Sequence, residues 1–180
     1  MQTVPYTDIQ INEFGTCIYT DSMGGNREDN GYPNKSNYRV IKTGHSKFYY
    51  IHRLVARVFV ENPAPRYFNV VHHIDHDRSN NHASNLEWTT HQMNNAQKVK
   101  MRLTKQTRTG YRVKFIFDHV VRNWMKIYKT KEEAYQAGII LKQQLINAKR
   151  AHIINCEKTG ENINEQLCPT CGSYSNNTSV

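Results

Sequence analysis

Residues 71–96 read VHHIDHDRSNNHASNLEWTTHQMNNA, and this stretch decides the expected fold. It contains five of the nine histidines in the chain: His72, His73, His76, His82 and His91. Several asparagines follow the adjacent pair His72-His73 at short intervals. Core segments rarely gather so many polar side chains that can bind a metal or carry a proton. The stretch is therefore the strongest candidate for a functional site.

The local pattern in this stretch predicts the order strand, loop, strand, helix. Residues 68–74 and 86–90 are rich in apolar, β-branched and aromatic side chains, which favours strands. Residues 75–85 are rich in Asp, Asn and Ser, which is typical of a loop. A helix is expected from Thr89 onward, because Thr89 and Gln92 have the spacing of a capping box.

The chain before this stretch is expected to be rich in strands. Residues 14–20 predict a short strand, and residues 21–37, rich in Gly, Asn, Asp and Ser, predict a long loop. Residues 37–42 and 47–51 predict a hairpin. Residues 52–60 repeat apolar side chains at helical spacing, which predicts a helix before the histidine pair.

The histidine pair has the chemistry that phosphodiester hydrolysis needs. A base must deprotonate water, and a cation must stabilise the charge that develops on the phosphate. A neutral imidazole suits the base near pH 7. Because neighbouring strand residues point to opposite faces, His72 and His73 are expected to have different tasks. A structural zinc site and a solvated histidine cluster are the alternatives.

The stretch resembles a known family of nucleases. His73, Asn85 and Asn94 match the spacing of the HNH (ββα-metal) homing endonucleases of phage introns, in the variant whose third motif residue is Asn. The text IHRLVARVF before the motif also looks like that family. The resemblance covers roughly residues 11–97 and implies an α+β nuclease domain of the ββα-metal type.

The resemblance implies roles for four residues. His73 becomes the general base, and Asn85 the residue that orients the loop. His72 and Asn94 become ligands of one divalent ion, with Mg²⁺ or Mn²⁺ expected. Many members have Asp or Glu at the position of His72, and imidazole admits softer ions more readily than a carboxylate does. The family also implies homing-type DNA cleavage, with nicking expected from a single motif.

Composition bounds the partners of the chain. Its 180 residues carry a net charge of +9 and a pI of about 9.4, which favours a polyanionic partner. No apolar run is long enough to span a membrane, and the first ten residues lack the pattern of a signal peptide. We therefore expect an intracellular protein, for example in the cytoplasm of a phage-infected bacterium. The expected partner is double-stranded DNA, with no membrane and no small-molecule substrate.

The positive charge lies in the second half of the chain. Residues 98–150 hold 14 Lys and Arg against 3 Asp and Glu, a balance of +11. We expect a basic linker over residues 98–110 and a hairpin followed by a helix over residues 111–150. The helix is expected over residues 130–150, with Thr130 and Glu133 as a capping box and Ala134, Gly138, Leu141 and Leu145 on one face.

The strands of this second module are expected to have one basic face. Alternation separates Tyr111, Val113 and Phe115 from their basic neighbours, and separates Val121 from Arg122. The residues expected to contact DNA on the basic face are Arg112, Lys114, Arg122, Trp124 and Lys126. The module resembles an AP2-type DNA-binding domain, on a short motif that ends in WMKIYKTKEEA. A solvated sheet face is the alternative.

The last part of the chain, residues 151–180, is expected to be a polar tail. It contains Cys168 and Cys171 in a C-x-x-C pair, and His152 with Cys156 would complete four ligands for a structural zinc ion. Free thiols are the alternative.

The division expected for the whole chain has four parts: residues 1–97 as an HNH nuclease domain with a β-rich start, 98–110 as the linker, 111–150 as the AP2-like module, and 151–180 as the tail. The competing functions are a non-catalytic DNA-binding protein with a structural metal in its histidine cluster, and an RNA-binding protein.

Overall fold

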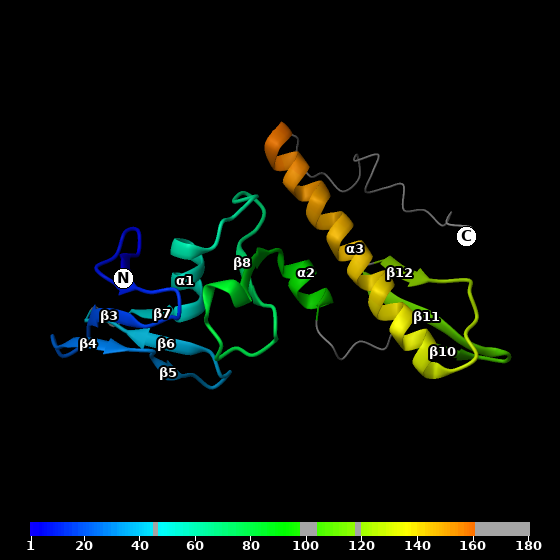
Figure 1. Ribbon diagram of the computed structural model, residues 1–180, viewed down its shortest axis with the longest axis horizontal. Coiled ribbons are helices and arrows are strands. Elements are labelled where there is room, and N and C mark those ends of the chain that lie inside the picture. The colour runs from blue at the N-terminus through cyan, green and yellow to red at the C-terminus, as the bar shows by residue number, and fades with distance from the viewer. Residues whose placement is uncertain (45–46, 98–103, 118–119, 161–180) are drawn as a thin grey trace. The chain divides into compact units, whose positions relative to one another are not determined.

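The computed structural model describes residues 1–44, 47–97, 104–117 and 120–160. The chain divides into two compact units, Met1–Thr89 and Thr90–Val180. Helices and short antiparallel strands occur in both units (Figure 1), so the expected α+β class is confirmed. Among the described residues, no helix is both long and apolar enough to cross a membrane. The four-part division expected from the sequence stays a prediction.

The first unit begins with a four-stranded antiparallel sheet. Its strands are β1 (Gln2–Thr3), β2 (Gln10–Ile11), β3 (Cys17–Thr20) and β4 (Asn26–Asp29), in that order. β4 and the short β5 (Tyr32–Pro33) lie within residues 21–37, so the long loop expected there was wrong. Three of the four residues of β4 are exposed, and it therefore shows no apolar alternation that would reveal a strand.

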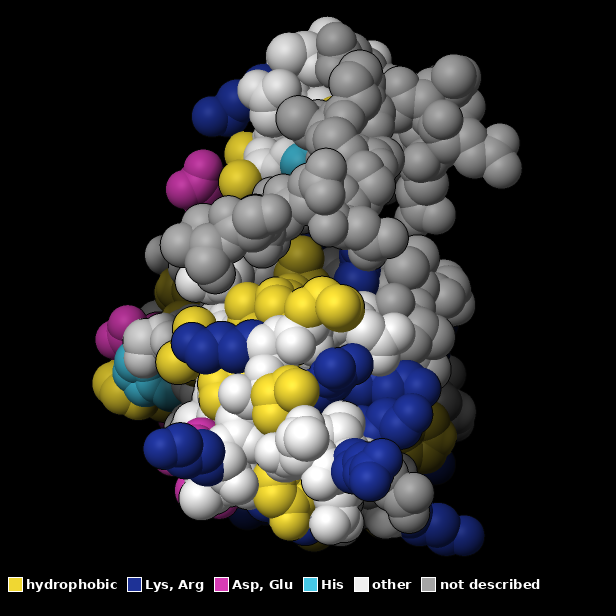
Figure 2. Space-filling view, turned by 90° about the vertical axis from the view of Figure 1, so that its right-hand side faces the viewer, with side chains coloured by type: hydrophobic (Ala, Val, Ile, Leu, Met, Phe, Trp, Pro, Cys, Tyr) yellow, Lys and Arg dark blue, Asp and Glu magenta, His cyan; other side chains and the backbone are white. Residues whose placement is uncertain are grey.

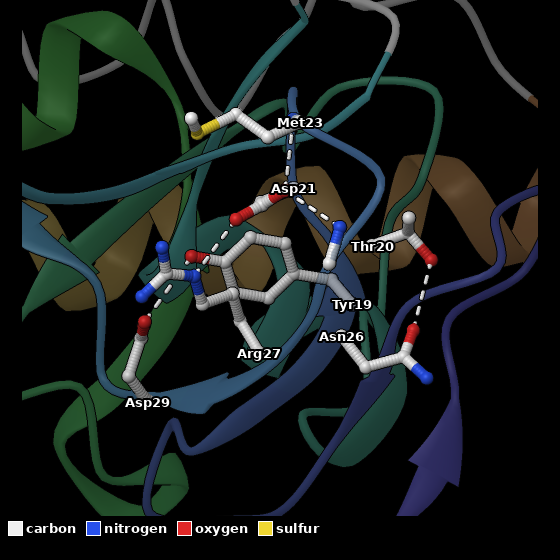
Figure 3. Close-up of polar contacts among 8 residues, drawn as sticks. Tyr19, Thr20, Asp21, Met23, Asn26, Arg27 and Asp29 are labelled. Carbon is white, nitrogen blue, oxygen red and sulfur yellow. Dashed lines mark hydrogen bonds and ion pairs between the residues drawn. The ribbon is translucent and has the colours of Figure 1, made fainter.

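The turn between β3 and β4 is held by one carboxylate. Asp21 accepts hydrogen bonds from the backbone N–H groups of Met23 and Gly25, at 2.8 and 2.9 Å, and pairs with Arg27 Nε at 2.8 Å. At the other end of the hairpin, the Tyr19 hydroxyl donates to Asp29 at 3.2 Å (Figure 3). The polar residues that suggested a loop are therefore the ones that close a hairpin.

A second sheet leads into the first helix. β5, β6 (Arg39–Lys42) and β7 (Phe48–Tyr50) form it, and the expected hairpin of β6 and β7 is confirmed. α1 (Ile51–Phe59) follows directly and buries Ile51, Leu54 and Val55, as its apolar spacing predicts.

The histidine stretch forms a two-stranded antiparallel ribbon. β8 (Val70–His73) pairs with β9 (Leu86–Thr89), and the short helix η1 (Ala83–Asn85) ends the loop between them. The Trp88 indole on β9 donates to the carbonyls of Ala56 and Val60, at 3.3 and 3.1 Å. These two bonds attach one face of the ribbon to α1.

The second unit begins with α2 (His91–Ala96). Its N-cap is Thr90, whose hydroxyl accepts from the Met93 N–H at 3.1 Å. The expected start at Thr89 was therefore one residue early, because Thr89 still pairs with Val70 in the ribbon. The order strand, loop, strand, helix is confirmed.

A three-stranded antiparallel sheet and a long helix complete this unit. The strands are β10 (Thr104–Thr107), β11 (Gly110–Phe117) and β12 (Val120–Asn123), and α3 (Lys131–Thr159) packs against β11 (Figure 1). The stretch expected as a linker thus contains β10, and α3 runs nine residues beyond the expected end at Arg150 into the expected tail. The capping box of Thr130 and Glu133 is confirmed.

The covered face of α3 differs in detail from the expected one. Ala134 and Gly138 are buried as expected, but Lys142 and Ile146 take the next places instead of Leu141 and Leu145. Burial lowers the pKa of the Lys142 ammonium. Further along, Ile153 and Cys156 are buried, which explains why the helix continues where a polar tail was expected.

Candidate active site

The histidine pair lies at the end of β8, and the two side chains take opposite faces of the ribbon. His73 is opposite Leu86, and His72 is opposite Glu87. Because Trp88 attaches the Val71 and His73 side of the ribbon to α1, His73 lies on the α1 side and His72 on the other. Both imidazoles are nonetheless buried. Different tasks for the two residues are therefore compatible with the geometry.

The His73 imidazole is held by one polar and two aromatic neighbours. Its Nε2 lies 3.3 Å from Asn81 Oδ1, and its ring centroid lies 5.1 Å from His52 and 6.0 Å from Tyr38. Burial lowers the pKa of His73, while the Asn81 hydrogen bond and nearby carboxylates act in the opposite direction. The net direction is downward, so His73 is neutral near pH 7, as a general base must be.

His52 is a member of this cluster that spacing along the sequence did not connect with His73. It lies in the first turn of α1, and its ring centroid lies 5.0 Å from that of Tyr38 and 5.6 Å from that of Tyr50. Burial lowers its pKa to about 3, with smaller contributions from His73 and Arg53. His52 is thus an uncharged ring that packs against the His73 imidazole. In the sequence, only the position of His52 beside the apolar repeat of the α1 helix could have indicated that its side chain is buried.

Asn85 closes the loop that follows the histidine pair. Its Nδ2 donates to Asp75 Oδ1 and to the Asn80 carbonyl, both at 2.9 Å, and its Oδ1 accepts from the Asp75 N–H at 3.1 Å. Its backbone carbonyl also accepts from Ile74 N–H at 2.9 Å. Asn85 therefore joins both ends of the loop, and the orienting role expected for it stays a prediction.

The acidic residues of the loop are occupied by turn hydrogen bonds. Asp75 accepts from Asn80, Asn85 and the Asp77 N–H, and these bonds lower the pKa of its carboxyl. Asp77 accepts from the N–H and hydroxyl of Ser79, which lowers its pKa as well. Both carboxylates stabilise the loop conformation.

The ligand set expected for a metal is small. His72 offers an imidazole whose ring lies 5.2 Å from that of His76, a residue with a left-handed backbone (φ 64°). In the part of the chain that the structure describes, no three His, Cys, Asp or Glu side chains gather as a metal site. One imidazole and one amide oxygen still fit a divalent ion whose other ligands are water and phosphate.

Asn94, the second expected ligand, lies on α2 in the second unit. It is half-buried and follows the Thr90 N-cap by one helical turn, and its N–H donates to the Thr90 carbonyl at 2.9 Å. Its pairing with His72 around an ion stays a prediction.

The register of the second sheet separates the residues expected to share a basic face. Lys114 is opposite Asn123, whereas Arg122 is opposite the buried Phe115. The Trp124 ring stacks on Phe115 at 5.4 Å and 16°. Because directly opposed residues point the same way, Arg122 and Trp124 lie on the face of Phe115 and not with Lys114. The single basic face that joined all five residues was therefore wrong.

A smaller basic face remains on this sheet. Arg112 is opposite Lys105 of β10, and Lys114 follows Arg112 by two residues on the same side. Lys126 lies beyond β12, with its ammonium 5.5 Å from the Tyr128 ring. Figure 2 shows dark-blue Lys and Arg side chains separated by hydrophobic ones on the face that it presents.

The zinc site expected in the tail is described only in part. His152 and Cys156 are one turn apart on α3, and Nε2 lies 3.4 Å from Sγ. Cys168 and Cys171 lie outside the described residues, so the four-ligand site stays a prediction.

Known proteins share the segment that holds this site. Residues 49–96 match the family model described as HNH endonuclease. The segment therefore carries the HNH endonuclease motif. The HNH resemblance seen in the sequence is confirmed for residues 49–96. HNH nucleases generally use a divalent metal ion. The phage-intron type and the AP2-like module stay predictions.

Two curated relatives are uncharacterized HNH endonucleases of Acanthamoeba polyphaga mimivirus. One is 49% identical over 53 residues, which is 29% of this chain and 16% of the relative. The other is 55% identical over 40 residues, which is 22% of this chain and 10% of the relative. This chain thus matches less than a fifth of the length of either relative. The HNH homing endonuclease I-HmuI, solved in a study of DNA binding and cleavage, is 30% identical with a TM-score of 0.41, covering 52% of this chain and 53% of that one.

Proposed function

We propose that the protein is a metal-dependent endonuclease that hydrolyses a phosphodiester bond in double-stranded DNA. The observation that carries the proposal is the buried His73 imidazole at the end of β8, 3.3 Å from Asn81, inside the HNH segment and beside a loop closed by Asn85. A net charge of +9 is compatible with a DNA substrate. One motif supplies one active site, so the expected product is a nick.

In the proposed mechanism His73 takes a proton from the attacking water. The rings of His52 and Tyr38 restrict its imidazole, and Asn85 keeps the adjoining loop in one conformation. His72 and Asn94 would hold the divalent ion, which when bound stabilises charge on the phosphate and the leaving oxygen. Holding the base in place before DNA binds reduces the reorganisation needed during the reaction.

The test of the proposal is a plasmid-nicking assay with defined metal ions. Supercoiled plasmid is incubated with the full chain and Mg²⁺, Mn²⁺ or a chelator, and the open-circular product is measured. Because His72 offers imidazole instead of a carboxylate, we expect Mn²⁺ to support nicking at least as well as Mg²⁺, and the chelator to abolish it. Absence of product with every ion would reject the nuclease function.

A matched variant tests the ligand itself. His72→Asp restores the carboxylate found in many HNH nucleases, and should raise the ratio of the Mg²⁺-supported to the Mn²⁺-supported rate. An unchanged ratio would mean that His72 does not contact the ion.

We further propose that the sheet of the second unit binds DNA in the manner of an AP2-like module. Its basic face consists of Lys105, Arg112 and Lys114, and a small sheet can enter the major groove. Homing-type site specificity and a phage origin are finer parts of the same proposal.

The salt dependence of DNA affinity tests this surface. Removing two phosphate contacts, as in the double variant Arg112→Ala/Lys114→Ala, should weaken binding and reduce the slope of log K against log salt by roughly 0.9 for each contact. Lys158→Ala removes a charge near the end of α3 and should leave the slope nearly unchanged. Both are measured by fluorescence anisotropy with a DNA duplex over a range of salt. An equal slope in the double variant would exclude this face from the interface.

A further inference from the structure

Asn81 is the polar partner of the proposed base, and the family motif residues do not include it. Its side chain is 6% exposed, and its Oδ1 lies 3.3 Å from His73 Nε2. Its Nδ2 donates to the Ser79 carbonyl at 3.2 Å. Both ends of the amide are therefore engaged within the loop.

The hydrogen bond from Asn81 to the Ser79 carbonyl determines which ring nitrogen of His73 carries the proton. A backbone carbonyl only accepts, so the amide end that faces Ser79 must be the NH₂ group. The other end, which faces His73, is then the carbonyl oxygen, and it can only accept. His73 must donate to it from Nε2–H, and in a neutral imidazole this leaves the lone pair on Nδ1.

We propose that Asn81 is a positioning residue that fixes the tautomer and ring orientation of His73, so that Nδ1 is the atom that takes the proton from water. This inference rests on the proposed nuclease function. In this role Asn81 controls the protonated nitrogen and the orientation of the His73 ring, in addition to stabilising the loop conformation.

A turn near the start of the chain holds Asn81 in place. Gly15 has φ 89°, and a Cβ added to it would lie 3.2 Å from Asn81 Cβ and 2.9 Å from Ile51 Cγ2. The Glu13 carbonyl accepts from the Ala83 N–H at 2.9 Å, two residues after Asn81. The Gly15 N–H donates to the Asn12 carbonyl at 3.1 Å, which closes a turn at Asn12–Gly15. This turn packs close to the Asn81 side chain and restricts its movement.

The competing role for Asn81 is to stabilise the loop through Ser79 alone. Two variants separate the roles. Asn81→Asp keeps an oxygen that accepts from His73 but loses the donor to Ser79. Asn81→Leu has similar volume and loses both bonds. Asn26→Leu on the exposed β4 is the matched control, because it makes the same chemical change away from His73.

Two measurements on the full chain test the inference. Nitrogen-15 NMR of the His73 ring, assigned by comparison with His73→Gln, reports which nitrogen carries the proton at a pH where the ring is neutral. Nicking kinetics with Mn²⁺ give kcat and KM for the same proteins. A residue that acts through the base should change kcat and leave KM for DNA nearly unchanged.

We expect the wild type and Asn81→Asp to carry the proton on Nε2, and Asn81→Leu to lose this single tautomer. We expect kcat to fall about 10- to 100-fold in Asn81→Leu, as for other residues that orient an imidazole from behind, and only a few-fold in Asn81→Asp. Asn26→Leu should match the wild type. Equal losses in Asn81→Asp and Asn81→Leu, or an unchanged tautomer in Asn81→Leu, would overturn the positioning role.

The results also separate this inference from the proposed function. A wild type that cleaves DNA, with an Asn81→Leu variant that keeps both its His73 tautomer and its kcat, would reject the role of Asn81 alone. If Asn81→Leu does not fold, the tautomer of Asn81→Asp still decides, because loss of Nε2–H in that variant contradicts the inference. A wild type with the expected tautomer and no cleavage would retain the positioning of His73 and reject the nuclease function.

Discussion

Replacing His73 with Ala is expected to lower the rate of DNA nicking by about 10²–10⁴-fold, the range typical for loss of a general base. The His73 imidazole is held by Asn81. His52 is the other imidazole among the described rings that contact His73, and burial lowers its pKa to about 3. The described residues near His73 thus offer no evident substitute. The measurement is the initial rate of open-circular plasmid formation.

The control for this variant comes from the same stretch of sequence. His91→Ala removes an exposed imidazole at the start of α2 and should leave the nicking rate unchanged. The unfolding temperature of both variants should be compared with the wild type, so that loss of fold is distinguished from loss of the base. Nicking by a folded His73→Ala variant at the wild-type rate would contradict the mechanism.

The second large effect is expected for Asn85→Ala. The change removes three side-chain hydrogen bonds that join Asn85 to Asp75 and Asn80. Leaving their partners without this amide should lower the free energy of unfolding by about 1–3 kcal/mol. Because the loop begins directly after His73, the nicking rate should also fall, by at least roughly tenfold.

Urea unfolding and nicking rates of the same preparation test both parts. Asn80→Ala is the matched control, since the Asn80 side chain is exposed and its removal leaves the three bonds of Asn85 in place. It should lower both quantities less than Asn85→Ala does. Equal effects of the two variants would mean that Asn85 has no special part in closing the loop.

The ribbon and its histidine pair were predictable because the information is local. Turn residues, capping spacing and strand alternation lie within residues 71–96, so the order of elements followed from short-range chemistry. The contacts of His73 were not predictable in the same way. Asn81 is eight residues away, and its approach depends on how the whole loop between β8 and β9 folds. His52 lies on a different element, and its approach depends on how α1 packs against the ribbon.

The basic face of the second sheet shows a different limit. Alternation separates Arg122 from Val121, but it does not say which of the two shares a face with Lys114. The pairing of β11 with β12 decides that, and it places Arg122 opposite Phe115. A register one residue different would have given the expected face.

Missed elements had weak local signals for physical reasons. β4 is exposed along most of its length, and its hairpin is closed by Asp21 instead of by apolar contacts. In the last turns of α3, Ile153 and Cys156 are both buried, and their spacing of three residues continues the helix beyond the end that was expected at Arg150. β4, by contrast, lacks the periodic apolar pattern from which elements are inferred.

The turn at Asn12–Gly15 has a consequence for inheritance. It lies outside residues 49–96, yet it leaves no room for a Cβ at Gly15 beside Asn81, and its Glu13 carbonyl accepts from the Ala83 N–H within that segment. A chimaera that joined residues 49–96 to an unrelated N-terminal segment would keep the histidines and lose the turn that packs beside Asn81. Residues 12–15 and the matched segment are therefore expected to be inherited together.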